Sequence, residues 1–272
     1  GMAFMAHEIL HGSVVKSKKV QDWLGFLGFA PFMISPTFWK FWHNRLHHGK
    51  TQNLAIDPDC FPNLAVYRRS KFMKWAFRYT PGSGYIRSYF YFSFWFMFQA
   101  FLSQAYFRFH NKNYKSVDQK KVTLEFAIMI VIFLVYAQFV GMGNWMYLLV
   151  IPFMVQNYTV MSYISTNHNL NPLTKVNDPL VNSLTVTNNS FWEFIHLNFG
   201  YHTEHHIFPR MSGQYVKIVS EQLKKQFPER YNIMPKSEAL KKLYSTPRVY
   251  KDKNTLIHPE THHTVGTIVE VE

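Results

Sequence analysis

Long apolar stretches dominate the middle of the chain and predict helices. Tyr89–Phe107 and Trp145–Ile164 contain no charged residue, and Val122–Val140 contains only Glu125. Each stretch is close to the roughly 20 residues that an α-helix needs to cross the hydrocarbon core of a bilayer. Only Gly141–Asn144 separates the last two stretches, which suits the short turn of a helical hairpin. The pattern therefore predicts a membrane-spanning hairpin.

Two other apolar segments are less suited to crossing a membrane. Trp23–Trp39 is interrupted by glycines and prolines, so it predicts a re-entrant or interfacial segment. Tyr89–Phe107 lies between Arg87 and Arg108, and basic flanks favour the cytoplasmic side. With both ends on that side, Tyr89–Phe107 would lie in the interface or re-enter, as its aromatic content also indicates.

The chain changes character after Arg210, where it becomes polar and basic, with an amphipathic helix predicted around Tyr215–Gln226. We expect an all-α integral membrane protein with a membrane-embedded domain, residues 1–210, and a cytoplasmic basic tail, residues 211–272, packed on it. The alternative is a soluble protein with three buried helices, which a mean hydropathy of −0.15 favours slightly. Soluble cores rarely contain three such long apolar runs with so little charge, so the membrane protein is preferred.

Charge and cysteine content narrow the class of protein further. The chain has 29 Lys and Arg against 16 Asp and Glu, a formal net charge of +13. The basic residues form patches separated by apolar stretches, and no nucleic-acid-binding motif accompanies them. This arrangement predicts that the chain interacts with a lipid bilayer and does not bind nucleic acid. The single Cys60 excludes a disulfide framework and a cysteine-based zinc or iron–sulfur site.

Histidine is the unusual part of the composition, because eight of the 14 histidines form three tight clusters and His168 lies just after the third apolar stretch. Residues three or four apart share one helix face, so each cluster directs at least two imidazoles to one point. One zinc ion needs three or four protein ligands, so eight or nine imidazoles predict two metal ions. The predicted metal ligands, all but His168 also predicted to be catalytic, are His7, His11, His43, His47, His48, His168, His202, His205 and His206.

Two other known motifs could account for some of these histidines. His7-Glu8-Ile-Leu-His11 also fits the His-Glu-x-x-His motif of zinc proteases, with Glu8 as general base. The pairs Glu8–His11 and Glu193–His196 fit the Glu-x-x-His motif of ferritin-like di-iron proteins. Both alternatives leave most of the clustered histidines without a role. His196 is expected to be a packing residue, and solvated positions are expected for His110, His258, His262 and His263.

The clusters read HEILH at 7–11, HNRLHH at 43–48 and HTEHH at 202–206, the last within NFGYHTEHHIFP. With a membrane hairpin between the second and third clusters, this order resembles the histidine boxes of the membrane fatty acid desaturase family. The resemblance covers nearly the whole chain. His168, in STNHN, falls where the family places an additional histidine. The third box begins with His202 rather than with the Gln that is typical of front-end desaturases.

The resemblance implies an oxidoreductase whose nine histidines hold two iron ions, with O₂ as co-substrate. The implied reaction introduces a double bond into a fatty acyl chain linked to lipid, coenzyme A or a carrier protein. Electrons would come from a ferredoxin or cytochrome b5-type protein, which the basic patches would attract. The di-iron site is implied to form a cap on the cytoplasmic face of the membrane, with Glu8 and Glu204 orienting histidine rings.

Two further functions remain open at this point. A histidine-box membrane hydroxylase acting on alkanes, carotenoids or lipids would use the same ligands. A non-catalytic metal-binding membrane protein would also keep them. The sequence does not separate these outcomes from desaturation.

The N-terminal residues carry one more expectation. Met2–His11 is too short to cross a bilayer, and the family normally has a membrane hairpin before the first box. We therefore expect that this hairpin lies upstream of Gly1 and is missing from the chain. The first box should then lie on a helix that starts abruptly and leaves Phe4 and Met5 as an exposed apolar flank.

Overall fold

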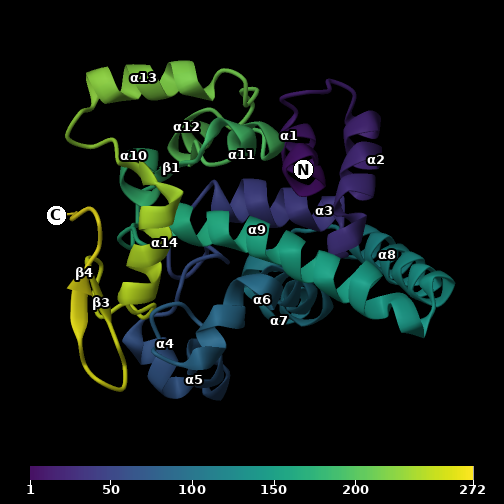
Figure 1. Ribbon diagram of the computed structural model, residues 1–272, viewed down its shortest axis with the longest axis horizontal. Helices are drawn as coiled ribbons and strands as arrows, with labels where there is room; N and C mark the ends of the chain where they lie inside the picture. The colour runs from purple at the N-terminus through teal and green to yellow at the C-terminus, as the bar shows by residue number, and fades with distance from the viewer. Residues whose placement is uncertain (272) are drawn as a thin grey trace. The chain divides into compact units, whose positions relative to one another are not determined.

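The computed structural model describes residues 1–271, and most of them are helical (Figure 1). Contacts between residues divide the chain into two compact units. The first unit consists of Gly1–Leu46 and Phe92–Met161, and the second of His47–Tyr91 and the described residues from Ser162 onward. Each unit is therefore built from two stretches that are far apart in the sequence.

The regular elements of the first unit are all helical. They are α1 (Met2–His11), α2 (Lys18–Phe29), η1 (Ala30–Phe32), α3 (Pro36–Trp39), α6 (Tyr91–Leu102), η4 (Ser103–Phe107), α7 (Arg108–His110), η5 (Lys112–Tyr114), α8 (Gln119–Val140), η6 (Met142–Asn144) and η7 (Met146–Val150). Two further helices begin in the first unit and end in the second, namely the π-helix η2 (Lys40–His47) and α9 (Ile151–His168).

The predicted hairpin of helices is present. Gly141, with a φ of 71°, ends α8 in a conformation that favours glycine, and the single turn η6 leads into η7 and α9. The indole of Trp145 donates a hydrogen bond of 2.8 Å to the carbonyl oxygen of Ala137 across the turn. The rings of Phe133 and Phe153 stack with centroids 5.6 Å apart. These contacts hold the start of the second arm against the end of the first.

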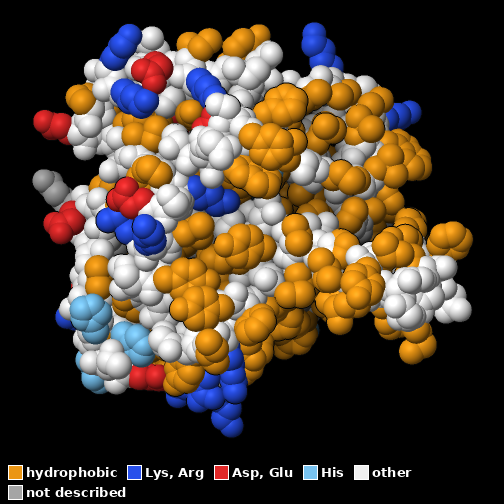
Figure 2. Space-filling view, in the orientation of Figure 1, with side chains coloured by type: hydrophobic (Ala, Val, Ile, Leu, Met, Phe, Trp, Pro, Cys, Tyr) orange, Lys and Arg blue, Asp and Glu red, His pale blue; other side chains and the backbone are white. Residues whose placement is uncertain are grey.

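Both arms of this hairpin expose apolar side chains. Gln119–Val140 and Met146–His168 are the two described helices that are long and apolar enough to cross a membrane. In their most apolar windows only 22% and 39% of the residues are buried. Phe139, near the turn, is 87% exposed, and Figure 2 shows hydrophobic side chains covering this part of the first unit. The helices thus have the length and surface that a membrane crossing requires.

Glu125, the one charge in the apolar part of α8, has a structural use. Its carboxylate accepts hydrogen bonds from the hydroxyls of Ser35 (2.5 Å) and Thr37 (2.9 Å) and from the backbone N–H of Thr37 (3.1 Å). Ser35 is also the N-cap of α3, where its hydroxyl accepts from the N–H of Phe38. The carboxylate therefore fixes the start of the segment that leads into the second histidine cluster.

The two doubtful apolar segments are both irregular. Trp23–Trp39 is broken as expected, because α2 ends at Phe29, the 3-10 helix η1 contains Pro31, and Pro36 starts α3. Tyr89–Phe107 runs from the 3-10 helix η3 (Ile86–Phe90) through α6 into the π-helix η4. Neither segment forms one long regular α-helix.

Helices α1 and α2 pack closely because α2 presents glycines to α1. A Cβ atom on Gly25 would lie 2.4 Å from Cδ2 of Leu10, and one on Gly28 would lie 2.6 Å from the Cβ of Ala6. Such separations are far below van der Waals contact, so an added methyl group would displace the Leu10 side chain at Gly25 and press on the Ala6 Cβ at Gly28.

The expected exposed flank of α1 is only partly present. Phe4 is 2% exposed, so the prediction is wrong for that residue, because α1 turns it into the packed interior of its unit. Met5 is 53% exposed, as predicted. Adjacent residues on a helix point about 100° apart, which is why one is buried and the next is exposed.

The second unit combines short helices with two small sheets. Its elements are α4 (Leu64–Arg69), α5 (Lys71–Phe77), η3, α10 (Pro179–Asn182), β1 (Thr185–Thr187), α11 (Ser190–Ile195), α12 (His202–Ile207), α13 (Val216–Gln226), β2 (Ile233–Pro235), α14 (Lys236–Ser245), β3 (Thr255–Ile257) and β4 (Thr264–Gly266). β1 and β2 pair in parallel, and β3 and β4 form an antiparallel hairpin (Figure 1).

These sheets correct the all-α expectation, although the chain is mostly helical. Each strand has only three residues, too few for an alternating pattern to be recognised in the sequence. The amphipathic helix predicted around Tyr215–Gln226 is confirmed as α13.

Candidate metal centre

Three predicted ligands meet in the first unit. His7 and His11 lie one turn apart on α1, with ring centroids separated by 4.5 Å. His43, on the π-helix η2, places its Nε2 atom 3.0 Å from the Nε2 of His7. We call His7, His11 and His43 the trio.

An aromatic side chain packs on all three rings of the trio. The indole of Trp39 stacks on His43 with centroids 4.5 Å apart and meets His7 and His11 edge-on at 5.4 and 5.3 Å. Trp39 is buried and lies one turn before His43. It therefore restricts the ring orientations of ligands from both helices, a role that the sequence analysis did not assign.

Four predicted ligands meet in the second unit. Their nitrogen ligand atoms all lie within 4.8 Å of one another, and all four residues are buried. They come from the end of η2, the end of α9 and one face of α12, and they are His47, His168, His202 and His206. We call these four residues the tetrad.

Hydrogen bonds orient three of the four tetrad rings through Nδ1. The Nδ1 of His47 lies 2.9 Å from a carboxylate oxygen of Asp57, and that of His168 lies 3.0 Å from the backbone oxygen of Asn182. The Nδ1 of His206 lies 3.3 Å from the hydroxyl of Thr51. A proton on Nδ1 leaves the Nε2 lone pair of each ring available for a metal.

Two more predicted ligands adjoin the tetrad. His48 and His205 bring their Nε2 atoms to 3.1 Å, and the ring of His48 stacks on His206 with centroids 4.1 Å apart. The second unit thus gathers six of the nine predicted ligands, and the first unit gathers the other three.

The spacing of the imidazoles tests whether a metal fits. Two nitrogens about 2.1 Å from one metal, at an angle of about 90° to 110°, lie about 3.0 to 3.4 Å apart. The Nε2 pairs His7–His43, His48–His205 and His202–His206 are separated by 3.0, 3.1 and 3.2 Å. Among the described residues the buried Nε2 of His168 has no hydrogen-bond partner, which a metal ion would provide. The residues therefore fit metal binding.

The electrostatics favour neutral rings at three of the four tetrad histidines. Burial, with the neighbouring histidines, lowers the pKa of His168, His202 and His206 well below the usual value for histidine. Burial also acts to lower the pKa of His47, but the carboxylates of Asp57 and Asp59 outweigh it and raise that pKa. Neutral imidazole is the form that binds metals.

The third box is held in place by β1. A Cβ on Gly200 would lie 2.1 Å from the carbonyl oxygen of Val186, and the Gly200 carbonyl accepts a 2.8 Å bond from the Val186 N–H. On α12, the buried Glu204 accepts hydrogen bonds from Thr185 (2.7 Å) and Tyr231. The expectation that Glu204 orients a histidine ring is therefore not met, because its described partners belong to β1 and to the segment before β2.

The remaining expectations about side chains are met more closely. The Glu8 carboxylate lies 3.6 Å from Nδ1 of His7, so it adjoins a ligand as expected.

His196 stacks on Trp192 and lies 3.0 Å from the hydroxyl of Tyr163, which makes it a packing residue. Glu193 pairs with Lys217 at 2.6 Å, and it belongs to none of the groups of possible metal ligands found among the described residues, which gives the ferritin-like alternative no support there. Of the four histidines that were expected to be solvated, three are exposed, namely His110, His262 and His263. The fourth, His258, is partly buried.

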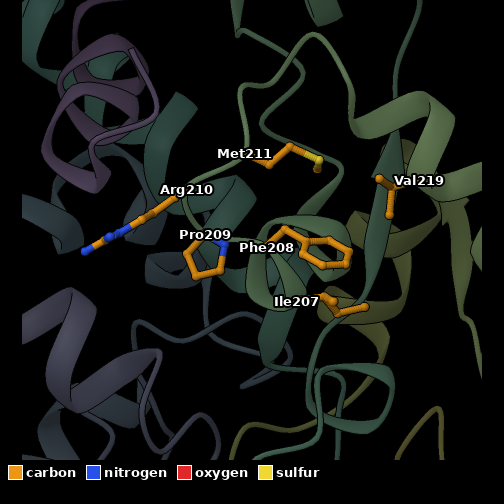
Figure 3. A pocket seen from close by; sticks show the side chains of 6 residues that line it. All are labelled: Ile207, Phe208, Pro209, Arg210, Met211 and Val219. Atoms are coloured by element: carbon orange, nitrogen blue, oxygen red, sulfur yellow. The ribbon is translucent and has the colours of Figure 1, made fainter. Parts of the chain in front are cut away.

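An apolar hollow of about 570 Å³ follows the third box directly (Figure 3). Its lining residues are Ile207, Phe208, Pro209, Arg210, Met211 and Val219. In Figure 3 the Arg210 side chain points away from the others, which leaves an apolar lining. No histidine contributes to this lining, so the hollow is distinct from the tetrad.

The comparison with protein families shows which family the chain belongs to. The profile of the family described as fatty acid desaturase matches residues 1–237. The chain belongs to the fatty acid desaturase family. This membership agrees with the family resemblance of the three boxes and of His168.

Curated relatives of this desaturase-family chain are distant. It is 23% identical over 252 residues to the chloroplastic omega-6 fatty acid desaturase of Arabidopsis thaliana, covering 86% of this chain and 52% of that protein. The corresponding protein of Brassica napus is 23% identical over 250 residues, covering 86% and 53%. The sn-1 acyl-lipid omega-3 desaturase (ferredoxin) of Synechocystis sp. is 34% identical over 58 residues, which are 21% of this chain and 16% of that protein. This chain spans about half the length of the omega-6 relatives.

Proposed function

We propose that this chain carries the catalytic centre of an O₂-dependent di-iron desaturase that introduces a double bond into a fatty acyl chain. The observation that carries the proposal is the tetrad, in which His47, His168 and His206 have Nδ1 occupied by hydrogen bonds while Nε2 remains for a metal. Family membership favours this chemistry over that of other histidine-rich metal proteins.

All nine predicted ligands take part in the proposal. The tetrad is assigned to one iron ion, and we assign the other five histidines to the second, namely His7, His11, His43, His48 and His205. Two observations support the second assignment: the Nε2 spacings of 3.0 and 3.1 Å within the pairs His7–His43 and His48–His205, and the family resemblance of the boxes.

The protein supplies binding and orientation for this chemistry. Iron with O₂ supplies the oxidising power to remove two hydrogens from adjacent methylene carbons, which no amino-acid side chain provides. Asp57, the backbone oxygen of Asn182 and Thr51 set the ring orientations. The buried imidazoles of the tetrad give neutral ligands and exclude bulk water from the centre.

The surroundings of the centre belong to the same proposal. Helices α8 and α9, with their exposed apolar side chains, would cross the bilayer and place the active site on its cytoplasmic face. Residues 1–210 would be embedded in the membrane, and residues 211–272 would form the cytoplasmic basic tail. The acyl chain would be linked to lipid, coenzyme A or a carrier protein. Electrons would come from a ferredoxin or cytochrome b5-type donor, and the name of one relative specifies ferredoxin.

The test is iron and product analysis of the protein in a host with defined lipids. We expect two irons per chain and a new double bond in the host acyl chains. His47→Ala and His205→Ala should abolish the product because each removes a ligand, whereas His263→Ala, in the exposed β3–β4 turn, should not. One zinc and no iron in the purified protein would contradict the proposal.

The same product analysis separates desaturation from the alternatives. Hydroxylated lipids, alkanes or carotenoids would identify a histidine-box hydroxylase. Bound iron with unchanged lipids, in the presence of reductant and O₂, would identify a non-catalytic metal-binding protein.

A further inference from the structure

The loop that follows the second box contacts three of the four tetrad ligands. This box-two loop, residues 49–60, contains Thr51, Gln52 and Asp57, all of which are buried. Its contacts reach His47, His168 and His206, although these ligands come from segments up to 155 residues away in the chain. The loop therefore has the contacts needed to assemble the tetrad.

Asp57 is the centre of the loop. One carboxylate oxygen lies 2.9 Å from Nδ1 of His47 and accepts the N–H of Asp59 at 3.0 Å. The other oxygen accepts the backbone N–H of Gln52 at 2.7 Å. The loop is thus closed on itself by the same carboxylate that orients the His47 ring.

Gln52 has an unfavourable backbone conformation at this point. Its φ of 58° lies in the left-handed region, which residues other than glycine seldom adopt. Surrounding contacts hold it there, since the N–H donates to Asp57 and the carbonyl accepts from the N–H of Thr174 at 3.0 Å. Conformations of this kind persist where the neighbouring structure fixes them, often at functional sites.

The side chain of Gln52 reaches a second ligand. Its Nε2 donates to the backbone oxygen of His168 at 2.6 Å. His168 is the last residue of α9, and the final carbonyls of a helix have no partner within that helix. Gln52 therefore caps the helix end that carries a ligand.

The Gln52 amide is fixed by further contacts. Nε2 also lies 3.1 Å from the backbone oxygen of Asn171 and 3.0 Å from the hydroxyl of Tyr250, which itself donates to the Asn171 oxygen at 2.6 Å. These groups lie beyond α9 and before β3, so Gln52 joins three distant parts of the second unit.

We propose that Gln52 is a positioning residue that couples the two ligands His47 and His168 into one metal site. Its backbone N–H holds the carboxylate that orients His47, and its side chain holds the carbonyl of His168. The role rests on the proposed function in one respect, namely that the tetrad binds iron. Gln52 itself does not touch the metal.

The test compares variants that separate the backbone of Gln52 from its side chain. Gln52→Gly keeps the N–H to Asp57 and relieves the left-handed φ, but removes the amide donors. Gln52→Glu keeps the shape and turns a carboxylate oxygen toward the carbonyls of His168 and Asn171. Gln214→Gly, at an exposed turn position, is the matched control.

The measurements are iron per chain, the rate of iron release to a chelator and the Mössbauer spectrum of the iron-loaded full chain. Loss of contacts behind metal ligands typically weakens metal binding about 10- to 100-fold. We expect release from one of the two irons to accelerate by about tenfold or more in Gln52→Gly and in Gln52→Glu, with a changed signal for that iron only. Gln214→Gly should match the wild type.

Each outcome decides the inference. If the wild type holds two irons and Gln52→Gly releases both at the wild-type rate with an unchanged spectrum, the coupling role is wrong while the proposed function stands. If Gln52→Gly loses thermal stability but keeps its iron behaviour, Gln52 is only a structural residue and the inference also fails. If the wild type binds no iron, the proposed function fails, and the inference falls with it.

Discussion

The trio and the tetrad hold their histidines by different means. In the trio, Trp39 packs against all three rings, and α1 is pressed on α2 through glycines. In the tetrad, Asp57 and Thr51 contact ring nitrogens, and so does the backbone oxygen of Asn182. The contacts described around the trio are mainly packing contacts, and those described around the tetrad are mainly hydrogen bonds to Nδ1.

The difference has a consequence for how each set responds to change. A hydrogen bond to Nδ1 fixes the tautomer as well as the ring angle and raises the basicity of Nε2. Packing fixes the ring angle alone. Polar substitutions should therefore affect the tetrad more than the trio, whereas changes of side-chain volume should affect the trio.

The largest expected difference lies between two carboxylates. Asp57 lies 2.9 Å from Nδ1 of His47 with its side chain 1% exposed, whereas Glu8 lies 3.6 Å from Nδ1 of His7 with its side chain 13% exposed. Asp57→Asn should weaken iron binding about 10- to 100-fold, because it removes the charge behind a ligand. Glu8→Gln should change it by less than about threefold, since its contact with the ring is longer and its side chain is less fully buried. Iron titration of both variants measures the two losses of iron affinity. Equal losses would show that the Asp57 carboxylate supports its ligand no better than the Glu8 carboxylate does.

Acidification should act on the tetrad in the metal-free protein. The lowered pKa of His202 and His206 means that the unfolded chain, with histidines near about 6.5, binds protons that the folded chain does not. The free energy of unfolding should therefore be highest above about pH 6.5 and fall as the pH drops below that value. His47, with its raised pKa, works in the opposite direction, but it is one ring against three, because burial also lowers the pKa of His168.

Thermal unfolding of the metal-free chain between about pH 8 and about pH 5 measures this dependence. His202→Gln removes one of the three rings with a lowered pKa and should give a shallower curve. A melting temperature that rises on acidification would show that His47 dominates.

The sequence predicts the ligands better than the groups behind them. Histidines four apart on a helix, as in His7 and His11, can be recognised because their spacing itself places them together. The contacts of Thr51 and Asn182 with tetrad rings join residues 155 and 14 positions apart, and one of them uses a backbone oxygen that any residue has. Among the groups behind the ligands, only Asp57 could be recognised from the sequence. It belongs to Asp57-Pro-Asp59, which places two carboxylates shortly after a histidine box in a chain with few acidic residues.

The same contrast applies to the fold. The α8–α9 hairpin follows from uniform apolar composition around a glycine turn. Both boundaries at the turn are predicted to within one residue, whereas α8 begins three residues earlier and α9 ends four residues later than predicted. The π-helical conformation of η2 is not predicted, since its residues fit an α-helix equally well and tertiary contacts select the wider turn.

A smaller effect is expected from the indole that packs on the trio. Trp39→Leu leaves a cavity beside the rings and should reduce stability by less than the about 3–5 kcal/mol typical of a Trp→Ala change in a core. Iron release should accelerate a few-fold at one of the two sites, because His43 loses its stacking partner. Trp39→Phe, which keeps an aromatic face, should recover most of the iron retention. Chelator-release kinetics and Mössbauer spectra of both variants test this, and equal behaviour of Leu and Phe would show that stacking is unimportant.

The smallest effect on iron is expected at the α1–α2 contact, and it depends on which atom an added methyl group meets. In Gly25→Ala the new Cβ meets the end of the flexible Leu10 side chain, which can change rotamer, whereas in Gly28→Ala it meets the Cβ of Ala6, which cannot move without its helix. Overpacking typically costs about 1–3 kcal/mol, and replacing a helical glycine by alanine returns about 1 kcal/mol. Because the Ala6 Cβ cannot give way, the upper part of the overpacking range applies to Gly28→Ala, which should lower the free energy of unfolding by about 1–2 kcal/mol. Gly25→Ala should be close to neutral. Denaturant unfolding in detergent measures both. If Gly28→Ala is as stable as the wild type, the close approach of α1 to α2 does not hold the trio, and packing around Trp39 must do so alone.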